Sequence, residues 1–180
     1  QALYYSKLMM TNGYKPSIIT FNFLLRKIAT DKTGKSGESD DKVNQLISLL
    51  HHIHQVIPKH QQFEIIHGVI KLLSIEESYD VLTFFLNSHP FQQEKSLLND
   101  KLKERILISY NLILYKMVIQ TQETDKMNQL QYDQLLTLFR TIMNEDIPSY
   151  NLTCDILTHN YYLQLLTQIN QLKLAALHLV

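Results

Sequence analysis

Four polar side chains recur in one local pattern and are the residues best suited to bind a ligand. Asn22, Glu64, Asn111 and Asp155 each follow an aromatic or soft apolar residue, and each precedes two apolar residues. An amide or a carboxylate offers directional hydrogen bonds to a bound molecule or to the backbone. The same residue types favour helix starts, where they cap N–H groups and meet the positive end of the helix dipole. The pattern leaves two interpretations open for each residue, a binding group or a helix cap.

The prolines indicate where helices end and the next ones begin. Each of the four follows an apolar, helix-like run: Pro16, Pro58, Pro90 and Pro148. A proline cannot continue a helix and favours a turn. Asn22 and Glu64 lie six residues after a proline, and Asp155 lies seven after one. We therefore expect these residues near the starts of helices.

The whole sequence predicts helices and no sheet. Hydrophobic residues make up 45% of the chain, and glycines and prolines number only 4 each, so that long helices are barely interrupted. The predicted helices span residues 1–12, 18–29, 43–57, 60–74, 76–88, 101–121, 128–144, 151–161 and 163–178. Because one helix pair cannot bury its apolar side alone, neighbouring pairs must stack.

The predicted fold class is therefore all-α, a single α-solenoid of antiparallel helix pairs over residues 1–180. We expect repeats over 18–57, 59–90, 101–149 and 150–180, with polar insertions at 30–42, 89–100 and 122–127. Helical patterns reach both ends of the chain, which predicts a fragment of a longer protein.

Several segments share a recognisable repeat pattern. In residues 13–25 a glycine stop and a proline turn precede a helix that opens on Thr20-Phe21-Asn22. Residues 132–143 with Ile147-Pro148, and the segment 109–113, follow the same form. The chain thus resembles a pentatricopeptide repeat (PPR) protein, of the degenerate type found in fungal mitochondria.

This resemblance implies binding of single-stranded RNA, with successive helical repeats contacting successive bases. A polar residue near the start of each first helix would contact a base edge: Asn22, Glu64, Asn111 and Asp155. A second residue at the end of each repeat would assist it: Ser17, Lys59 and Ser149. An apolar residue before the reading position, such as Ile19 or Ile108, would sandwich the base. Glu64 departs from the usual Asn, Thr or Ser, so its repeat is the one least expected to contact a base.

Basic residues on the predicted first helices suit contacts to RNA phosphates. They are Arg26, Lys27, Lys101, Lys103, Arg105 and Lys116. An ordinary solvated face is the other interpretation. The formal net charge is zero, which is unusual for an RNA-binding chain. It suits a rival hypothesis, an α-solenoid that binds a peptide or a protein subunit, in which an apolar groove would replace a positive stripe through Arg26, Lys103 and Lys116.

No sequence motif predicts catalysis, a cofactor or a metal. His51 and His54 lie one helical turn apart and are compatible with zinc, but no HExxH motif, P-loop or GxSxG motif is present. No apolar run is long enough to span a membrane. By resemblance, we expect a non-enzymatic protein of the mitochondrial matrix. It would act in RNA stability, processing or translation, alone or with the mitoribosome.

Overall fold

The computed structural model describes Tyr4 and residues 8–9, 11–14, 16–30, 39–88, 100–123 and 129–168. Within these residues the regular structure is entirely helical, with no strand, so the predicted all-α class is confirmed. The chain divides into two compact units, Gln1–Leu97 and Leu98–Val180. A single array over 1–180 stays a prediction.

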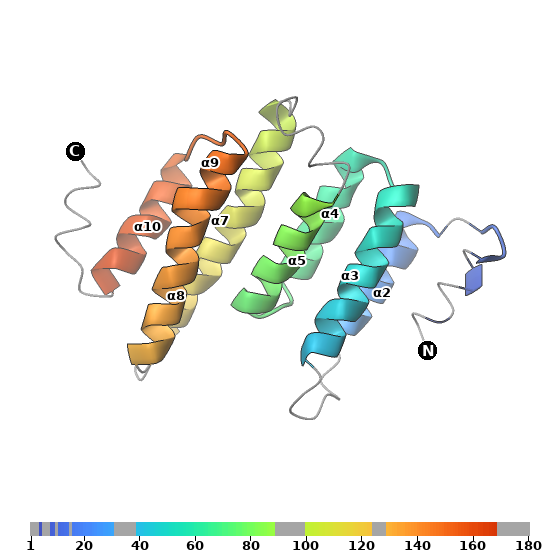
Figure 1. Cartoon of the computed structure of the whole chain (residues 1–180), viewed down its shortest axis with the longest axis horizontal. Helices are drawn as coiled ribbons and strands as arrows, with labels where there is room; N and C mark the ends of the chain where they lie inside the picture. Colours follow the sequence, from blue (N-terminus) through green and yellow to red (C-terminus); the bar gives the residue numbers. More distant parts are fainter. Residues whose placement is uncertain are drawn as a thin grey trace. The chain divides into compact units, whose positions relative to one another are not determined.

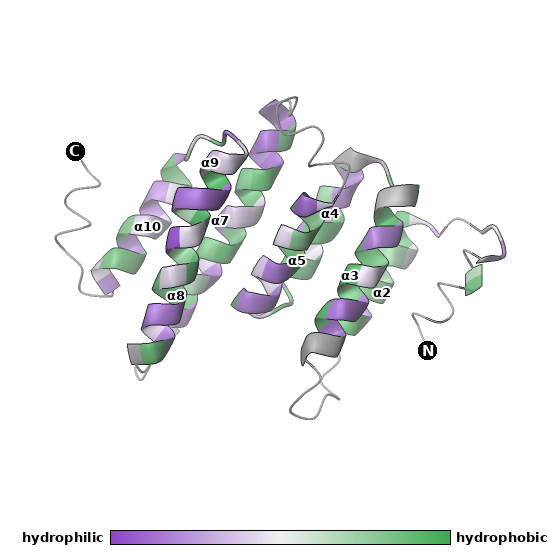
Figure 2. Cartoon of the chain, in the orientation of Figure 1, coloured by the Kyte–Doolittle hydropathy of each residue, from purple (hydrophilic) through white to green (hydrophobic). Residues whose placement is uncertain are grey.

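The first unit contains the helices α2 (Ile18–Thr30), α3 (Ser39–Val56), α4 (Lys59–Ile70) and α5 (Ile75–Asn87), shown in Figure 1. Helix α2 contacts α3 and α4, and helix α5 contacts the same two helices. Each helix carries both hydrophilic and hydrophobic residues, as Figure 2 shows. The hydrophobic residues meet in a core that includes the Phe63 and Phe85 rings, edge to face at 5.2 Å between centroids. Burial of each large apolar side chain contributes about 1.5–3 kcal/mol.

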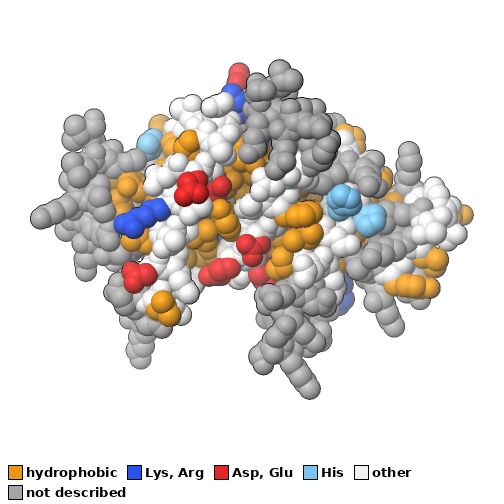
Figure 3. Space-filling view, in the orientation of Figure 1, with side chains coloured by type: hydrophobic (Ala, Val, Ile, Leu, Met, Phe, Trp, Pro, Cys, Tyr) orange, Lys and Arg blue, Asp and Glu red, His pale blue; other side chains and the backbone are white. Residues whose placement is uncertain are grey.

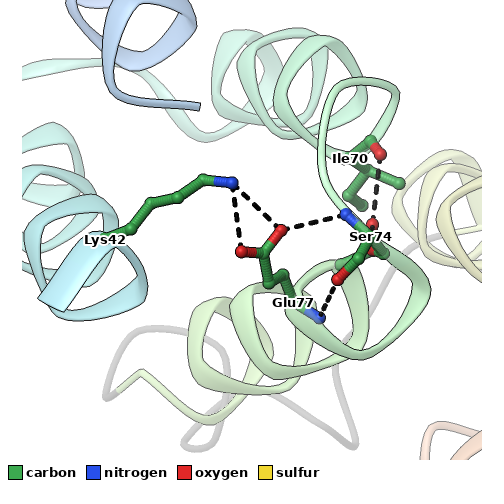
Figure 4. A network of polar contacts seen from close by, with 5 residues as sticks. Lys42, Ile70, Ser74 and Glu77 are labelled. Carbon is green, nitrogen blue, oxygen red and sulfur yellow. Dashed lines mark hydrogen bonds and ion pairs between the residues drawn. The ribbon is translucent and has the colours of Figure 1, made fainter. Parts of the chain in front are cut away.

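A capping box fixes the start of α5. The Ser74 hydroxyl accepts a hydrogen bond from the Glu77 N–H (3.2 Å), and the Glu77 carboxylate accepts one from the Ser74 N–H (3.0 Å). Lys42 of α3 reaches the same carboxylate, with its Nζ 3.0 and 3.1 Å from the two oxygens (Figure 4). Desolvation raises the pKa of Glu77, but the hydrogen bonds from Ser74 and the Lys42 charge outweigh it and bring the pKa below 4.5. One carboxylate thus caps α5 and ties it to α3.

The second unit contains α7 (Asp100–Glu123), α8 (Gln129–Thr141), the π-helical turn η2 (Ile142–Asp146), α9 (Ile147–Ser149) and α10 (Ile156–Gln168). Helix α10 packs along α7. It also meets α8, where the Phe139 and Tyr162 rings stack at 4.9 Å between centroids. Phe139 is almost fully buried and Leu138 is half-buried, so Phe139 is the residue of the two that belongs to the core.

Three predicted boundaries in the repeats are wrong. Helix α3 begins at Ser39, inside the insertion predicted at 30–42, and α4 ends at Ile70 because the capping box starts a new helix. The break predicted between helices 151–161 and 163–178 is absent, because α10 runs through residue 162 without interruption, and residues 151–155 precede that helix. No glycine or proline interrupts that stretch, and Tyr162 is held by its stack on Phe139. Residues 31–38, 89–99, 124–128 and 169–180, which include most of the predicted insertions, lie outside the described residues.

Pro148 also lies elsewhere than predicted. It was expected beyond the end of a helix, but it lies within α9, in a helical stretch that continues from α8 through η2. The π turn carries the chain into this proline: the Ile147 N–H donates to the Ile142 carbonyl, five residues back. Pro148 therefore lies in the first turn after the change in hydrogen-bond pattern at η2. The backbone N–H that a proline lacks is not required at that place.

Candidate nucleic-acid interface

The helices α2 and α10 are both preceded by the same kind of helix stop. Gly13 and Asn151 adopt left-handed backbone conformations, with φ of 79° and 52°. In each case the next N–H donates to a carbonyl five residues back: Tyr14 to Met9 at 3.0 Å, and Leu152 to Ile147 at 3.1 Å. This is the Schellman motif, in which glycine is preferred and asparagine is tolerated. The glycine stop predicted at Gly13 is confirmed, and Asn151 is its counterpart.

Four residues after each stop, an N-cap begins the next helix. The Ser17 hydroxyl accepts a hydrogen bond from the Thr20 N–H at 3.3 Å, and Asp155 Oδ1 accepts one from the Thr158 N–H at 2.8 Å. The threonine hydroxyl also bonds to the cap, at 3.1 Å in the first case and 2.7 Å in the second. The starts of α2 and α10 therefore share their caps as well as their stops.

These shared contacts correct the register predicted from the sequence. They align residues 17–25 (SIITFNFLL) with residues 155–163 (DILTHNYYL). Asn22 therefore corresponds to Asn160, and Asp155 corresponds to the N-cap of α2 rather than to Asn22. The sequence signal for Asn160 was the Thr-aromatic-Asn form, with His159 in the aromatic place, nine residues after Asn151.

Asn111 lies in the middle of α7 and not near a helix start, where it was predicted. It is in direct contact with Asp155, 44 residues further along the chain. Asn111 Nδ2 donates to both carboxylate oxygens of Asp155, at 3.1 and 3.3 Å. The Thr158 hydroxyl lies 2.7 Å from both Asn111 Oδ1 and Asp155 Oδ1, and its one hydrogen can serve either acceptor. Thr158 is fully buried and Asn111 is 7% exposed. We call these three residues the amide cluster.

The amide cluster fixes which way the Asn111 side chain faces. A carboxylate only accepts hydrogen bonds, so the NH2 group of Asn111 must point toward Asp155. Desolvation raises the pKa of Asp155, but hydrogen bonds from Thr158, Asn111 and the Leu157 N–H outweigh it and lower the pKa below 3.8. Asp155 is therefore ionised at neutral pH and holds the amide in one orientation.

Large aliphatic side chains are exposed three residues before an asparagine on α2, α7 and α10, at the second residue of α2 and of α10 but at the ninth residue of α7. The asparagines are Asn22, Asn111 and Asn160, and the aliphatic residues are Ile19 (76% exposed), Ile108 (44%) and Leu157 (53%). Two of them were the residues predicted to sandwich a base. Side chains of this kind usually lie in a core. Their exposure gives each unit, taken by itself, apolar surface suited to an apolar or aromatic ligand face.

The other predicted base-contacting residues are separate from the amide cluster. Asn22 is half-buried on α2, Glu64 is exposed on α4, and Ser17 is the exposed N-cap. Lys59 begins α4, and its side chain lies outside the described part of the structure. Ser149 lies in α9, where its hydroxyl donates to the Asp146 carbonyl at 2.8 Å. The assisting position predicted for Ser149 corresponds in the corrected register to Asp155.

The predicted phosphate-binding residues lie on α2 and α7. Arg26, Lys27 and Lys101 are exposed, and Lys103, Arg105 and Lys116 are half-buried. The charge around α8 is mixed, since Asp133, Arg140 and Glu145 are exposed, and Figure 3 shows both acidic and basic side chains there. In the second unit, the helix that carries Asn111 thus also carries the basic residues that were predicted to contact phosphates.

The described residues contain no group of three His, Cys, Asp or Glu side chains able to hold a metal ion. Of the histidines predicted to be compatible with zinc, His51 is exposed, and the side chain of His54 lies outside the described set. Across the described ranges, none of the helices is both long and apolar enough to cross a bilayer.

Comparisons with protein-family models, curated proteins and solved structures find no match to this chain.

Proposed function

We propose that this chain is a PPR-like α-solenoid that binds single-stranded RNA, with Asn111 as the base-contacting residue best prepared for that task. By the same resemblance, it acts without catalysis on transcripts in the mitochondrial matrix, in RNA stability, processing or translation, alone or with the mitoribosome.

Contacts between alternate helices support the solenoid. Helix α2 meets α4, α3 meets α5, and α7 meets α10. Stacked helix pairs make such contacts, because first helices then form one layer and second helices another. On this view α2, α4, α7 and α10 are the first helices of successive repeats, and they carry Asn22, Glu64, Asn111 and Asn160.

The observation that carries the proposal is the oriented amide of Asn111. PPR repeats are expected to combine a reading residue with an assisting residue at the repeat's end, and Asp155 stands at that second position in the corrected register. Its bonds to Asn111 at 3.1 and 3.3 Å hold a donor and an acceptor in fixed places. A preset amide loses little freedom when it pairs with the edge of an unpaired base. Ile108, three residues before Asn111, and Leu157, two residues after Asp155, have exposed side chains. These side chains offer apolar surface on which the flat face of a base can lie.

A binding assay with base-substituted RNAs tests this proposal. Fluorescence anisotropy of short labelled single strands would compare the wild-type chain with Asn111→Ala and with Asn144→Ala, an exposed asparagine on η2. We expect Asn111→Ala to lose about 1–3 kcal/mol for its preferred base and to flatten discrimination at that one position. Asn144→Ala should bind as the wild type does. Unchanged discrimination in Asn111→Ala would overturn the assigned role, and the comparison of RNAs is insensitive to partial unfolding of a variant.

One observation favours a second candidate function, the protein-binding scaffold. Helix α2 exposes Phe23 (68%) as well as Ile19, and such side chains also suit the apolar face of a partner helix. This alternative predicts that salt has little effect on partner binding and that Lys103→Gln and Lys116→Gln leave partner affinity unchanged. RNA binding predicts a steep dependence on salt.

A further inference from the structure

Two tyrosines pair at the surface between α7 and α10. The Tyr115 and Tyr161 rings lie 5.8 Å apart between centroids, tilted by 53°. Tyr115 is 46% exposed and Tyr161 is partly exposed. Neither belongs to the buried core, which in this unit is built from residues such as Tyr110, Ile113 and Phe139. Core packing therefore does not explain why these rings meet.

The pair lies on the same helix faces as the amide cluster and its aliphatic neighbours. On α7, Ile108, Asn111 and Tyr115 follow one another at intervals of three and four residues, which places them along one face. On α10, Tyr161 follows Leu157 by four residues and so shares its face. Tyr115 is thus four residues, about 6 Å, beyond Asn111 along α7.

An unpaired base is the ligand whose chemistry fits these rings. Each ring offers an extended π face, and stacking of a base on an aromatic side chain requires no particular base sequence. Lys116, the neighbour of Tyr115, and the basic residues near the start of α7 provide the positive charge that a phosphate backbone requires. A partner helix would need apolar surface alone, whereas a base also has its phosphate backbone to place against the basic residues of α7.

We propose that Tyr115 and Tyr161 form a stacking subsite for an unpaired RNA base beside the base contacted by Asn111. The subsite rests on the proposed RNA-binding function and adds to it a sequence-independent anchor. Asn111 would then supply discrimination, while the tyrosine pair supplies affinity common to all sequences.

Paired substitutions in the full chain test this subsite. In Tyr115→Leu/Tyr161→Leu the stacking faces are lost, and we expect affinity for every single-stranded RNA to fall by roughly 5- to 150-fold, the range for loss of one base stack. In Tyr115→Phe/Tyr161→Phe the rings remain and affinity should stay within about twofold of wild type. Tyr132→Leu on α8 is the matched control and should also bind normally. Circular dichroism melts would establish that each variant is folded.

An abasic scan identifies the stacked nucleotide. With wild-type protein, removing one particular base should cost as much affinity as the double leucine substitution, and the same removal should cost the leucine variant nothing. Equal losses in the phenylalanine and leucine variants would overturn stacking, because the hydroxyl groups would then make the contact. Unchanged binding by a folded leucine variant would overturn the subsite while leaving the RNA-binding proposal in place. Absence of wild-type binding at low salt would instead remove the RNA-binding proposal and the subsite with it.

Discussion

Removing the Asp155 side chain should destabilise the protein more than removing the equivalent cap of α2. Asp155 and Ser17 hold the same position, each accepting a hydrogen bond from the N–H three residues later. Asp155 additionally accepts the bonds from Asn111. Comparison of Asp155→Ala with Ser17→Ala therefore separates the amide cluster from ordinary helix capping.

The magnitude follows from the contacts. Loss of an N-cap costs about 1 kcal/mol, which is the whole cost expected for Ser17→Ala. Asp155→Ala also removes the acceptor from the buried Asn111 amide, and a buried donor left unsatisfied costs about 1–3 kcal/mol. Asp155 is exposed, so water can reach the Asn111 amide once the carboxylate is removed. The lower half of that range therefore applies. We expect a total of about 2–3 kcal/mol for Asp155→Ala, and about 1 kcal/mol for Asp155→Asn, which retains a capping oxygen.

Urea unfolding followed by circular dichroism would measure these differences in the free energy of unfolding. A Thr158→Val variant, which removes one hydroxyl from the buried cluster, should also be destabilised. If Asp155→Ala costs no more than Ser17→Ala, the Asn111–Asp155 contact contributes nothing and the argument for an oriented amide fails.

Three further predictions concern the fold. Phe139→Ala should cost about 3–5 kcal/mol in the free energy of unfolding, because it removes a buried ring, whereas Leu138→Ala should cost clearly less; equal costs in urea unfolding would contradict the assigned packing. Gly13→Ala should cost about 1–2 kcal/mol because Gly13 has a left-handed φ, and a melting temperature unchanged by this substitution would show that the helix stop is unimportant. Because the pKa of Glu77 is lowered by folding, its contribution to stability should be complete above the ordinary value of 4.5 and should be lost as pH falls through the lower folded value. Glu77→Gln should weaken that acid dependence of stability, and an identical pH profile in the variant would refute the Lys42–Glu77 account.

Local signals in the sequence predicted much of the helical structure but misplaced one register. Gly13 was recognised as a stop because glycine is the usual residue for a left-handed position. Asn151 plays the same part without being glycine. Pro148, used to set the phase of the last repeat, lies inside a helical turn rather than after a helix. The pattern of polar residues was therefore aligned so that Asp155 corresponded to Asn22, and the true counterpart of Asn22, Asn160, was missed.

Long-range contacts account for the rest of the site. The bond between Asn111 and Asp155 depends on how α10 packs along α7, and neither sequence segment contains that information. The same is true of Tyr115 and Tyr161, which were not singled out from the sequence. Base contact and helix capping appeared as alternatives for Asp155. The structure shows that it caps α10, and the proposed function adds a second task for the same carboxylate, the orientation of Asn111.

Direct titration of RNA tests the central claim most directly. Fluorescence anisotropy would compare a randomised single-stranded RNA with a duplex of equal length, at low salt and at increasing salt. RNA binding predicts saturable binding of the single strand, weaker binding of the duplex, and an affinity that falls as salt rises. A chain that binds neither RNA at low salt, or that binds both equally, would contradict it.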